Sequence, residues 1–192
     1  MSAGDFYSLL FRMKHIDRWG LMRTVFKENL AEHSMEVAVL AHALATIGNV
    51  KLGKTHDCEH IALASLFHDM NEILTGDLPT PVKYYNDDIR TAYKKIEETS
   101  REKMLSLLDE DLQESYRQAL QVTPEQELLI KAADRLCAYL KCADEIKHAN
   151  NDFSNALQST RQSLEQMECP ELKYFIEHYL SCFEKTLDQI TL

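Results

Sequence analysis

Residues 61–74 read IALASLFHDMNEIL, and this stretch decides how the chain is expected to fold. At about 100° of rotation per residue, a helix through it gathers apolar side chains on one stripe. The members of that stripe are Leu63, Leu66, Phe67, Met70, Ile73 and Leu74. His68, Asp69 and Glu72 project from the opposite side, where their neighbours are small or apolar rather than charged. The pattern predicts a helix over 57–75 that is buried on both sides.

A buried histidine and two buried acids need a partner, because unpaired buried charge is costly. A divalent cation is one such partner. His68 and Asp69 alone would hold an ion weakly, so further ligands must come from other helices. The alternative is an ordinary solvated helix face, on which the same residues would meet water.

The remainder of the chain shows the same helical periodicity, with apolar residues recurring at spacings of three and four. Only five glycines and four prolines occur in 192 residues, so we expect an all-α fold. The expected helices span residues 4–14, 30–48, 57–75, 86–108, 110–121, 124–149, 152–167 and 170–189. Residues 75–85, TGDLPTPVKYY, are expected to form a loop, because glycine and proline disfavour regular structure there.

Three sequence signals mark the beginnings of helices. Asn29 is followed three positions later by Glu32, which has the form of a capping box. Thr123 precedes Pro124, which places a capping hydroxyl before a proline in the first turn. Pro170 has the same role in opening the last helix.

Composition excludes several classes of protein. The length fits one soluble domain, with 45% hydrophobic and 27% charged residues. A net charge of −10 argues against binding to duplex nucleic acid or to an anionic membrane surface. No apolar run reaches the roughly 18 residues that a membrane span needs. Five scattered cysteines without a CxxC pair and the lack of a secretory signal favour the reducing cytoplasm.

Among the other histidines, His33 lies on the core-facing side of its expected helix. Four apolar residues follow it at +4, +7, +8 and +11, namely Val37, Leu40, Ala41 and Leu44. His33 is therefore a candidate ligand, although a core histidine with an ordinary hydrogen-bond partner explains the same pattern. His42 points away from that stripe, and His56, His60 and His148 lie in polar surroundings where we expect surface residues.

Asp134 is the acid least expected at its position. It lies in LLIKAADRLCAYL, residues 128–140, although aspartate is a poor helix former and this segment is otherwise expected to be buried. A cation would keep this carboxylate ionised. The alternative is a buried salt bridge to Arg135 or Lys131. By contrast, Glu145 falls in a charge-rich helix end and is expected to be solvated.

The order His33, His68-Asp69, Asp134 resembles the H…HD…D signature of the HD-domain superfamily of metal phosphohydrolases. Four longer stretches resemble the bacterial HD-domain 5′-deoxynucleotidases, the YfbR-like group. They are IDRW (16–19), ENLAEHS (28–34), FHDMNEILTGDLPTPVKY (67–84) and KAADRLCAYLKC (131–142). The resemblance covers nearly the whole chain, so residues 1–192 are expected to form a single HD-type domain.

The resemblance implies an all-α helical bundle, commonly a homodimer, that removes phosphate from deoxyribonucleoside 5′-monophosphates. It also implies a single divalent cation such as cobalt or manganese. The residues that match metal ligands are His33, His68, Asp69 and Asp134. Glu72 matches an acid required for catalysis, and Asp77 matches a substrate-binding carboxylate. Residues 119–123, ALQVT, depart from the more polar stretch that relatives use for substrate contacts.

Arg18 and Trp19 match a pair that contacts the nucleotide, and His33 is a further substrate contact. The planar guanidinium of Arg18 suits phosphate oxygens and catalysis at phosphorus, whereas a surface arginine is the alternative. Trp19 offers an apolar face to a sugar or base, or else packs in the core. Asp77 would accept a hydrogen bond from a ribose hydroxyl, unless it is an ordinary turn aspartate. Lys83 is expected to be exposed.

Two His and two Asp ligands leave open positions on an ion that prefers about six ligands, so a water and a phosphate oxygen fit beside them. Glu72 is placed to act as a base for the water or as an acid for the leaving oxygen. Two other functions remain open. One is a different HD hydrolase, such as a nucleotide pyrophosphohydrolase or a phosphodiesterase. The other is a nucleotide-sensing module, although a sensor has no need of a proton-transferring carboxylate.

Overall fold

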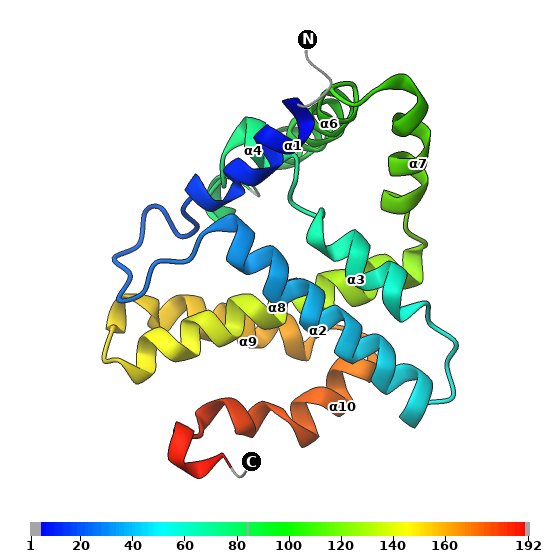
Figure 1. Ribbon diagram of the computed structural model, residues 1–192. Helices are drawn as coiled ribbons and strands as arrows, with labels where there is room; N and C mark the ends of the chain where they lie inside the picture. Colours follow the sequence, from blue (N-terminus) through cyan, green and yellow to red (C-terminus); the bar gives the residue numbers. More distant parts are fainter. Residues whose placement is uncertain (1–4, 84, 191–192) are drawn as a thin grey trace. The chain divides into compact units, whose positions relative to one another are not determined.

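The computed structural model describes residues 5–83 and 85–190, and within them all regular secondary structure is helical (Figure 1). The longer helices are α1 (Asp5–Leu10), α2 (Leu30–Lys51), α3 (Cys58–Leu66), α6 (Asp87–Leu105), α7 (Glu110–Leu120), α8 (Pro124–Lys147), α9 (Ser154–Glu165) and α10 (Pro170–His178). Single turns form α4 (Glu72–Thr75) and α5 (Thr80–Lys83), and 3-10 turns form η1 (Phe11–His15), η2 (Asn151–Phe153), η3 (Leu180–Glu184) and η4 (Leu187–Gln189). The prediction of an all-α fold is confirmed.

The chain divides into two compact units, each assembled from two separate stretches of sequence. The first comprises Met1–Glu36 and Leu63–Gln121, and the second comprises Val37–Ala62 and Val122–Leu192. Two of the three boundaries fall inside helices, in α2 and in α3, and the third lies between α7 and α8. Neither unit is therefore a continuous piece of chain, and the single domain expected over 1–192 stays a prediction.

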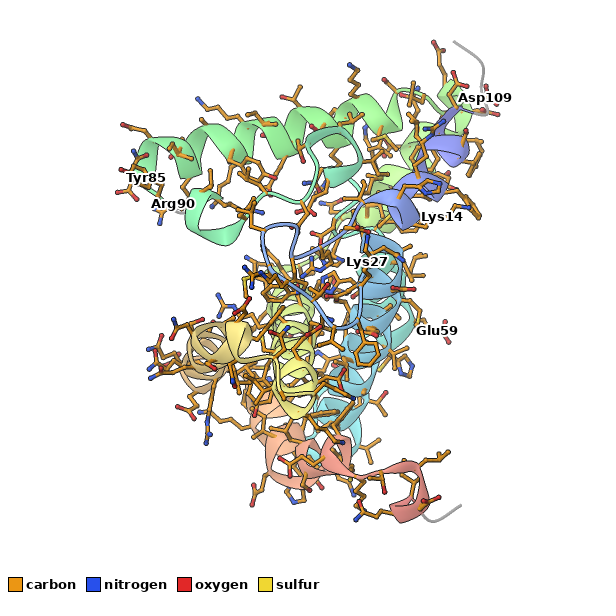
Figure 2. The ribbon with its side chains drawn as sticks, turned by 90° about the vertical axis from the view of Figure 1, so that its left-hand side faces the viewer. Lys14, Lys27, Glu59, Tyr85, Arg90 and Asp109 are labelled. Atoms are coloured by element: carbon orange, nitrogen blue, oxygen red, sulfur yellow. The ribbon has the colours of Figure 1, made fainter. Side chains whose placement is uncertain are left out.

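The core of the first unit is built on the inner face of α6. Its fully buried members are Phe6, Met70, Met104, Leu105 and Leu108, and Phe67, Ile73 and Tyr116 pack against them. The ring of Phe6 meets that of Tyr116 edge to face, with ring centroids 5.3 Å apart. Both α4 and α5 pack on α6, which runs between the labelled residues Tyr85 and Asp109 in Figure 2. The candidate site residues after α3 therefore rest on a long, regular support.

A closed loop precedes α2. An antiparallel bridge joins Asp17 to Asn29, with hydrogen bonds from the Arg18 amide to the Glu28 carbonyl (2.9 Å) and from the Leu30 amide to the Ile16 carbonyl (2.9 Å). Asn29 then caps α2, because its side chain accepts from the Glu32 amide and Glu32 accepts from the Asn29 amide. The predicted capping box is confirmed. The bridge joins residues twelve positions apart in the sequence, directly before α2.

The continuous helix expected over 57–75 is wrong. The α-helix ends at Leu66, and the next residues form tight i→i−3 bonds, such as His68 N to Ser65 O (3.3 Å) and Glu72 N to Asp69 O (2.9 Å). The imidazole Nδ1 of His68 also lies 2.7 Å from the Ser65 carbonyl oxygen, which an uninterrupted helix would offer to the Asp69 amide. A side chain therefore competes with the helix for this carbonyl, and the backbone tightens.

The expected apolar stripe is also wrong in part. Leu63 and Leu66 are 41% and 42% exposed, whereas Ile61 and Ser65, on the opposite side, are fully buried. Met70 is buried as expected, because it lies beyond the break and reaches the core of the first unit. A wheel drawn through 61–74 assumes a uniform rotation that the turn at 67–71 does not keep.

The loop expected over 75–85 is partly helical. Gly76 has a φ of +73°, which ends α4 and turns the chain toward Asp77. One helical turn, α5, follows at Thr80–Lys83, with the amide of Lys83 bonded to the Pro79 carbonyl (3.1 Å). A proline in a first turn costs no hydrogen bond, since the first N–H groups of a helix have no partner within it.

In the second unit, α8 packs against both α9 and α10. Thr123 and Gln126 form the capping box of α8, and proline opens both α8 and α10, so these predicted helix beginnings are confirmed. Glu145 was expected to be solvated, but it is fully buried. Lys141 donates to one of its oxygens (2.5 Å) and Asn150 to the other (2.7 Å), so the carboxylate ties the end of α8 to the chain that follows it.

His56 is likewise not a surface residue. Its side chain is 4% exposed, and its Nε2 lies 3.1 Å from an oxygen of the buried Glu171 at the beginning of α10. The ring also lies directly over Gly48 of α2, where a Cβ atom would stand 2.5 Å from His56 Cδ2. Glycine is required at this position by the close approach of the imidazole.

Over the described ranges, no helix combines the length and the apolar character that a membrane crossing requires.

We predict that Gly48→Ala lowers the free energy of unfolding by about 1–3 kcal/mol, because the new methyl group collides with His56. Without that collision the change would stabilise α2 by about 1 kcal/mol, since glycine is a poor helix former. Urea denaturation measures the effect, with Gly20→Ala as the control, because nothing lies within 4 Å of a Cβ there. In a His56→Ala background the sign should reverse, and a stabilised Gly48→Ala single variant would contradict the clash.

Candidate active site

His68 and Asp69 lie in the turn between α3 and α4, not on a regular helix. Because the Ser65 carbonyl can only accept, Nδ1 of the His68 ring carries a hydrogen, and Nε2 is the nitrogen turned toward the rest of the site. That Nε2 faces Asp69 Oδ2 at 3.0 Å. The turn therefore points two consecutive side chains at one place, whereas a helix would separate them by about 100°.

His33 is fully buried in the first turn of α2, on the stripe that continues through the buried Val37 and Ala41. Its Nε2 lies 3.7 Å from Asp69 Oδ2, and its Nδ1 lies 3.4 Å from Glu28 Oε1. One nitrogen of each ring, His33 and His68, lies within 4.8 Å of the other. The two imidazoles thus reach the same carboxylate oxygen from two different segments of the first unit.

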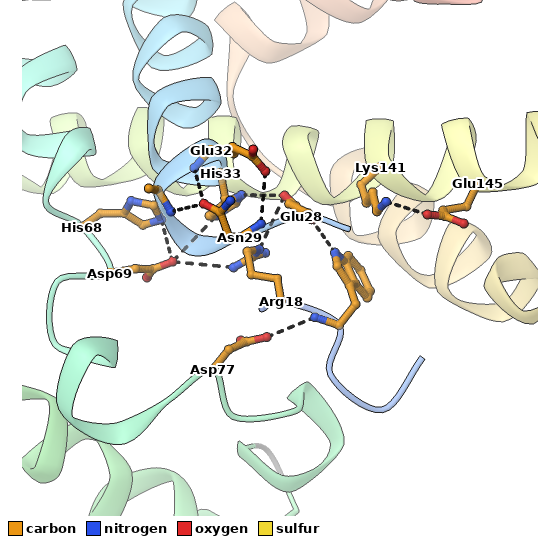
Figure 3. A network of polar contacts seen from close by, with 12 residues as sticks. Arg18, Glu28, Asn29, Glu32, His33, His68, Asp69, Asp77, Lys141 and Glu145 are labelled. Carbon is orange, nitrogen blue, oxygen red and sulfur yellow. Dashed lines mark hydrogen bonds and ion pairs between the residues drawn. The ribbon is translucent and has the colours of Figure 1, made fainter. Parts of the chain in front are cut away.

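This donor set fits a divalent transition metal. Two imidazole nitrogens and a carboxylate converge, and the second nitrogen of each ring faces an acceptor, Glu28 or the Ser65 carbonyl. Metal-binding histidines are usually held in this way, with one nitrogen bonded to an acceptor and the other turned to the ion. Figure 3 shows His33, His68 and Asp69 facing one another.

Arg18 lies beside the same carboxylate. Its Nη1 is 3.7 Å from Asp69 Oδ2 and its Nε is 3.6 Å from Glu28 Oε1, with the side chain only 12% exposed. Burial would raise the pKa of Asp69, but the charges of His68, His33 and Arg18 outweigh it and hold that pKa well below its usual range. The alternative of a surface arginine is therefore wrong.

Trp19 is half-buried and has a backbone φ of +58°, a left-handed conformation that costs a residue with a side chain about 1–2 kcal/mol. Two hydrogen bonds hold it there. Its amide donates to Asp77 Oδ2 (3.3 Å), and its indole Nε1 donates to Glu28 Oε2 (2.7 Å). Asp77 therefore joins the loop before α2 to the loop after α4, which is a more specific role than that of a turn aspartate.

Glu72 is the first residue of α4 and is 5% exposed. Burial, together with the negative charges of Asp69 and Asp77, raises its pKa from the ordinary 4.5 to about 8, although Lys83 and Arg18 oppose the shift. In the metal-free protein at neutral pH this carboxyl group therefore carries a proton. It is a titratable group with a pKa near the working pH, which is what proton transfer requires.

Lys83 is not the exposed lysine that the sequence led us to expect. Its Nζ lies 2.7 Å from Glu97 Oε1 and 4.7 Å from the ring centroid of Tyr93, both on α6. The side chain is 26% exposed. These contacts fix α5 on α6 and place a positive charge near Glu72.

Asp134 lies in the second unit, in the middle of α8. It is half-buried, whereas its helix neighbours Ala133 and Leu136 are fully buried. Lys131, which the sequence offered as a salt-bridge partner of Asp134, pairs with Glu127 on the same helix at 2.5 Å. The first unit thus contains all the other predicted site residues, which are Arg18, Trp19, His33, His68, Asp69, Glu72 and Asp77.

Two residues of this site were missed by the sequence analysis. Ser65 contributes only its backbone carbonyl, which no sequence pattern reveals. Glu28 precedes a capped helix and follows Lys27, so it resembled an ordinary surface charge, yet it is 8% exposed. Its place within the ENLAEHS motif was the one available signal.

The comparisons with known proteins agree with this site. Residues 5–183 match the family described as 5′-deoxynucleotidase YfbR-like. A 5′-deoxynucleotidase of Vibrio atlanticus (strain LGP32) is 44% identical over 194 residues, covering 100% of both chains. The 5′-deoxynucleotidase YfbR of Escherichia coli O1:K1 / APEC is 43% identical, covering 100% of this chain and 98% of its own.

Two solved structures show the fold. An HD-domain phosphohydrolase from Listeria innocua has a TM-score of 0.83 at 22% identity, covering 95% of this chain and 90% of its own. The HD phosphohydrolase DatZ of cyanophage S-2L, bound to dA and one catalytic Zn²⁺ ion, has a TM-score of 0.63 at 24% identity, covering 93% and 96%.

The helical fold, with its histidine–aspartate site, is similar to that of HD-domain phosphohydrolases of known structure. More narrowly, the chain belongs to the YfbR-like 5′-deoxynucleotidase family, and it is a hydrolase. The resemblance and the enzyme class expected from the motifs are confirmed.

We predict that Glu72→Gln changes how stability depends on pH in chelator-treated protein. In wild type, the raised pKa of Glu72 contributes stability below pH 4.5, and this contribution is lost as the pH rises to about 8. The glutamine of the variant cannot ionise, so the variant does not lose this stability. The free energy of unfolding of the variant relative to wild type should therefore rise by more than about 1 kcal/mol over this interval. Denaturation at several pH values measures it, with the exposed change Glu98→Gln as control, and parallel profiles would contradict the prediction.

Proposed function

We infer that this protein is a metal-dependent 5′-deoxynucleotidase, which hydrolyses deoxyribonucleoside 5′-monophosphates to deoxyribonucleosides and phosphate. One observation carries the inference. The Nε2 atoms of His33 and His68 converge on Asp69 Oδ2, at 3.7 Å and 3.0 Å, beside a buried Glu72 that holds a proton at neutral pH. Metal ligands and a proton-transferring group in one place are what phosphomonoester hydrolysis needs. Membership of the family supports the same substrate class.

The metal ligands in this proposal are His33, His68 and Asp69, with Asp134 of α8 as a fourth. We propose one divalent cation, with Co²⁺ or Mn²⁺ suited to a mixed imidazole and carboxylate set. When bound, such an ion lowers the pKa of a coordinated water and polarises a phosphoryl oxygen. The tautomer set by the Ser65 carbonyl supports this role, because it turns Nε2 of His68 toward the other ligands.

Arg18 is the proposed phosphate contact, and His33 also faces the substrate. In the absence of substrate the guanidinium is near two carboxylates, Asp69 and Glu28, at 3.7 Å and 3.6 Å. A phosphate dianion would replace these carboxylates and offer two oxygens to the guanidinium. The guanidinium would also stabilise the negative charge that develops on the phosphoryl group during transfer to water. Arg18 is thereby catalytic as well as substrate-binding.

Trp19 and Asp77 are the proposed contacts to the nucleoside. The Asp77 carboxylate accepts one hydrogen bond, from the Trp19 amide, and has acceptor capacity left for a sugar hydroxyl. The indole is held by its Nε1 and supplies an apolar ring of the kind that contacts a sugar or base. The strained backbone of Trp19 supports a functional role, since left-handed residues with side chains concentrate at such sites.

Glu72 transfers a proton at the reacting centre. It either takes the proton from the attacking water or gives one to the departing 5′-oxygen, and a pKa near the working pH allows both. The surrounding carboxylates are close enough to shift its pKa, so cation binding at Asp69 will lower that pKa again.

The proposal extends to assembly and location. A homodimer is supported by Leu63 and Leu66, apolar side chains of α3 that are 41% and 42% exposed. The reducing cytoplasm is supported by the five cysteines, none of which forms a disulfide bond in the described part of the chain. Duplex nucleic acid and membranes are not proposed partners.

We predict phosphate release from deoxyribonucleoside 5′-monophosphates when a single divalent cation is restored to chelator-stripped protein. The assay compares deoxy- and ribonucleoside mono-, di- and triphosphates with Mn²⁺, Co²⁺, Mg²⁺ or Zn²⁺ added singly. A pyrophosphohydrolase would act on triphosphates instead, and a sensing module would bind nucleotide without turnover. No phosphate from any monophosphate with any metal would refute the proposed function.

We also predict that Asp69→Ala and Glu72→Ala differ in what they lose. Asp69→Ala should lose both the ion and turnover, because a ligand is gone, whereas Glu72→Ala should keep the ion and lose at least about 100-fold in kcat. Metal content and steady-state kinetics measure the two effects, with Glu98→Ala on the exposed face of α6 as the matched control. Equal metal loss in both variants would refute the division of roles.

A further inference from the structure

Glu28 is the most extensively connected acid of the first unit that has no assigned role. It lies one residue before the Asn29 cap of α2, and it is 8% exposed. Its backbone position is set by the bridge, through the hydrogen bond from the Arg18 amide to the Glu28 carbonyl at 2.9 Å. The side chain is therefore presented in a fixed direction.

The carboxylate contacts three site residues at once. Oε2 accepts the indole N–H of Trp19 at 2.7 Å. Oε1 lies 3.4 Å from His33 Nδ1 and 3.6 Å from Arg18 Nε. Figure 3 shows Glu28 beside both His33 and Arg18, with a dashed contact to each. Each of the three partners carries a separate part of the proposed reaction, namely metal binding, phosphate binding and the nucleoside contact.

Glu28 faces Nδ1 of His33, whereas Asp69 faces Nε2. A carboxylate can only accept, so Glu28 is an acceptor for a proton on Nδ1, and the lone pair of Nε2 would then serve a cation bound on the Asp69 side of the ring. A purely structural acid would not need to face the metal-ligand ring.

We propose that Glu28 is a positioning residue, whose carboxylate fixes the Nδ1–H tautomer of His33 for metal binding and holds Arg18 and Trp19 in register with it. This inference rests on the proposed function for the roles of those three residues. Glu28 touches neither the ion nor the substrate in this scheme, so it acts through His33, Arg18 and Trp19 alone. Partners of this kind typically change metal affinity or activity by about 10–100-fold when they are lost.

The test compares Glu28→Gln, Glu28→Asp and Glu32→Gln. Glutamine keeps the size and an acceptor for Trp19 but can turn its amide group to His33. Aspartate restores the carboxylate on a shorter stem. Glu32→Gln makes the same charge change four residues later at an exposed position, and glutamine still completes the Asn29 capping box. Thermal unfolding of the metal-free proteins checks that each variant is folded.

Zn²⁺ affinity is measured by competition with a chromophoric chelator, and kcat and KM are measured with deoxyribonucleoside monophosphate. Glu28→Gln should bind Zn²⁺ about 10–100-fold more weakly and lose a similar factor in kcat. Glu28→Asp should recover part of both losses, and Glu32→Gln should match wild type. Wild-type Zn²⁺ affinity in a folded Glu28→Gln variant would overturn the proposal.

The His33 tautomer gives a readout that does not depend on activity or on any variant. Long-range ¹H–¹⁵N NMR spectra of metal-free wild type, recorded at about pH 8.5 where an ordinary imidazole is neutral, distinguish protonated Nδ1 from protonated Nε2. The proposal requires Nδ1–H at His33, and Nε2–H would overturn it even if Glu28→Gln did not fold. If wild type released no phosphate while this tautomer was found, the proposed function would fail and the positioning by Glu28 would stand.

Discussion

The hydrogen bond between the His68 imidazole and the Ser65 carbonyl is the interaction on which the site depends. His68 Nδ1 lies 2.7 Å from the Ser65 carbonyl oxygen, which would otherwise accept the next hydrogen bond of α3. The chain therefore turns tightly through residues 67–71 before α4 begins. The turn directs His68 and Asp69 to the same point and leaves Nε2 of His68 facing the carboxylate. A straight helix would have separated these side chains, so the break creates the metal-ligand geometry rather than merely tolerating it.

The loop closed by the Asp17–Asn29 bridge brings a second set of groups to the same place. Arg18 and Trp19 follow one partner of the bridge, Asp17, and Glu28 precedes the other, Asn29. One backbone pairing therefore sets the positions of all three. Trp19 keeps a left-handed backbone because both of its N–H groups are bonded, to Asp77 and to Glu28. The energy stored in that conformation is offset by contacts that order the site.

Charge balance explains why so many acids can share this small volume. Asp69 is held ionised by His68, His33 and Arg18, whereas Glu72, which is buried with fewer positive neighbours, keeps its proton to about pH 8. Two carboxyl groups three residues apart thus have opposite protonation states at neutral pH. Their environments, not their residue types, suit one to the proposed cation binding and the other to the proposed proton transfer.

By itself the sequence determined the helical class, the capped beginnings of α2 and α8 and the buried stripe from His33 to Leu44, and it supplied most residues of the candidate site. These follow from local periodicity, capping residues and motif order, which act over a few positions of chain. Only the tertiary structure decided the break after Leu66, the burial of His56 and Glu145, and the central place of Glu28. Each of these depends on partners that periodicity does not encode, such as a backbone carbonyl, a helix begun 115 residues later for His56, or the far side of a closed loop.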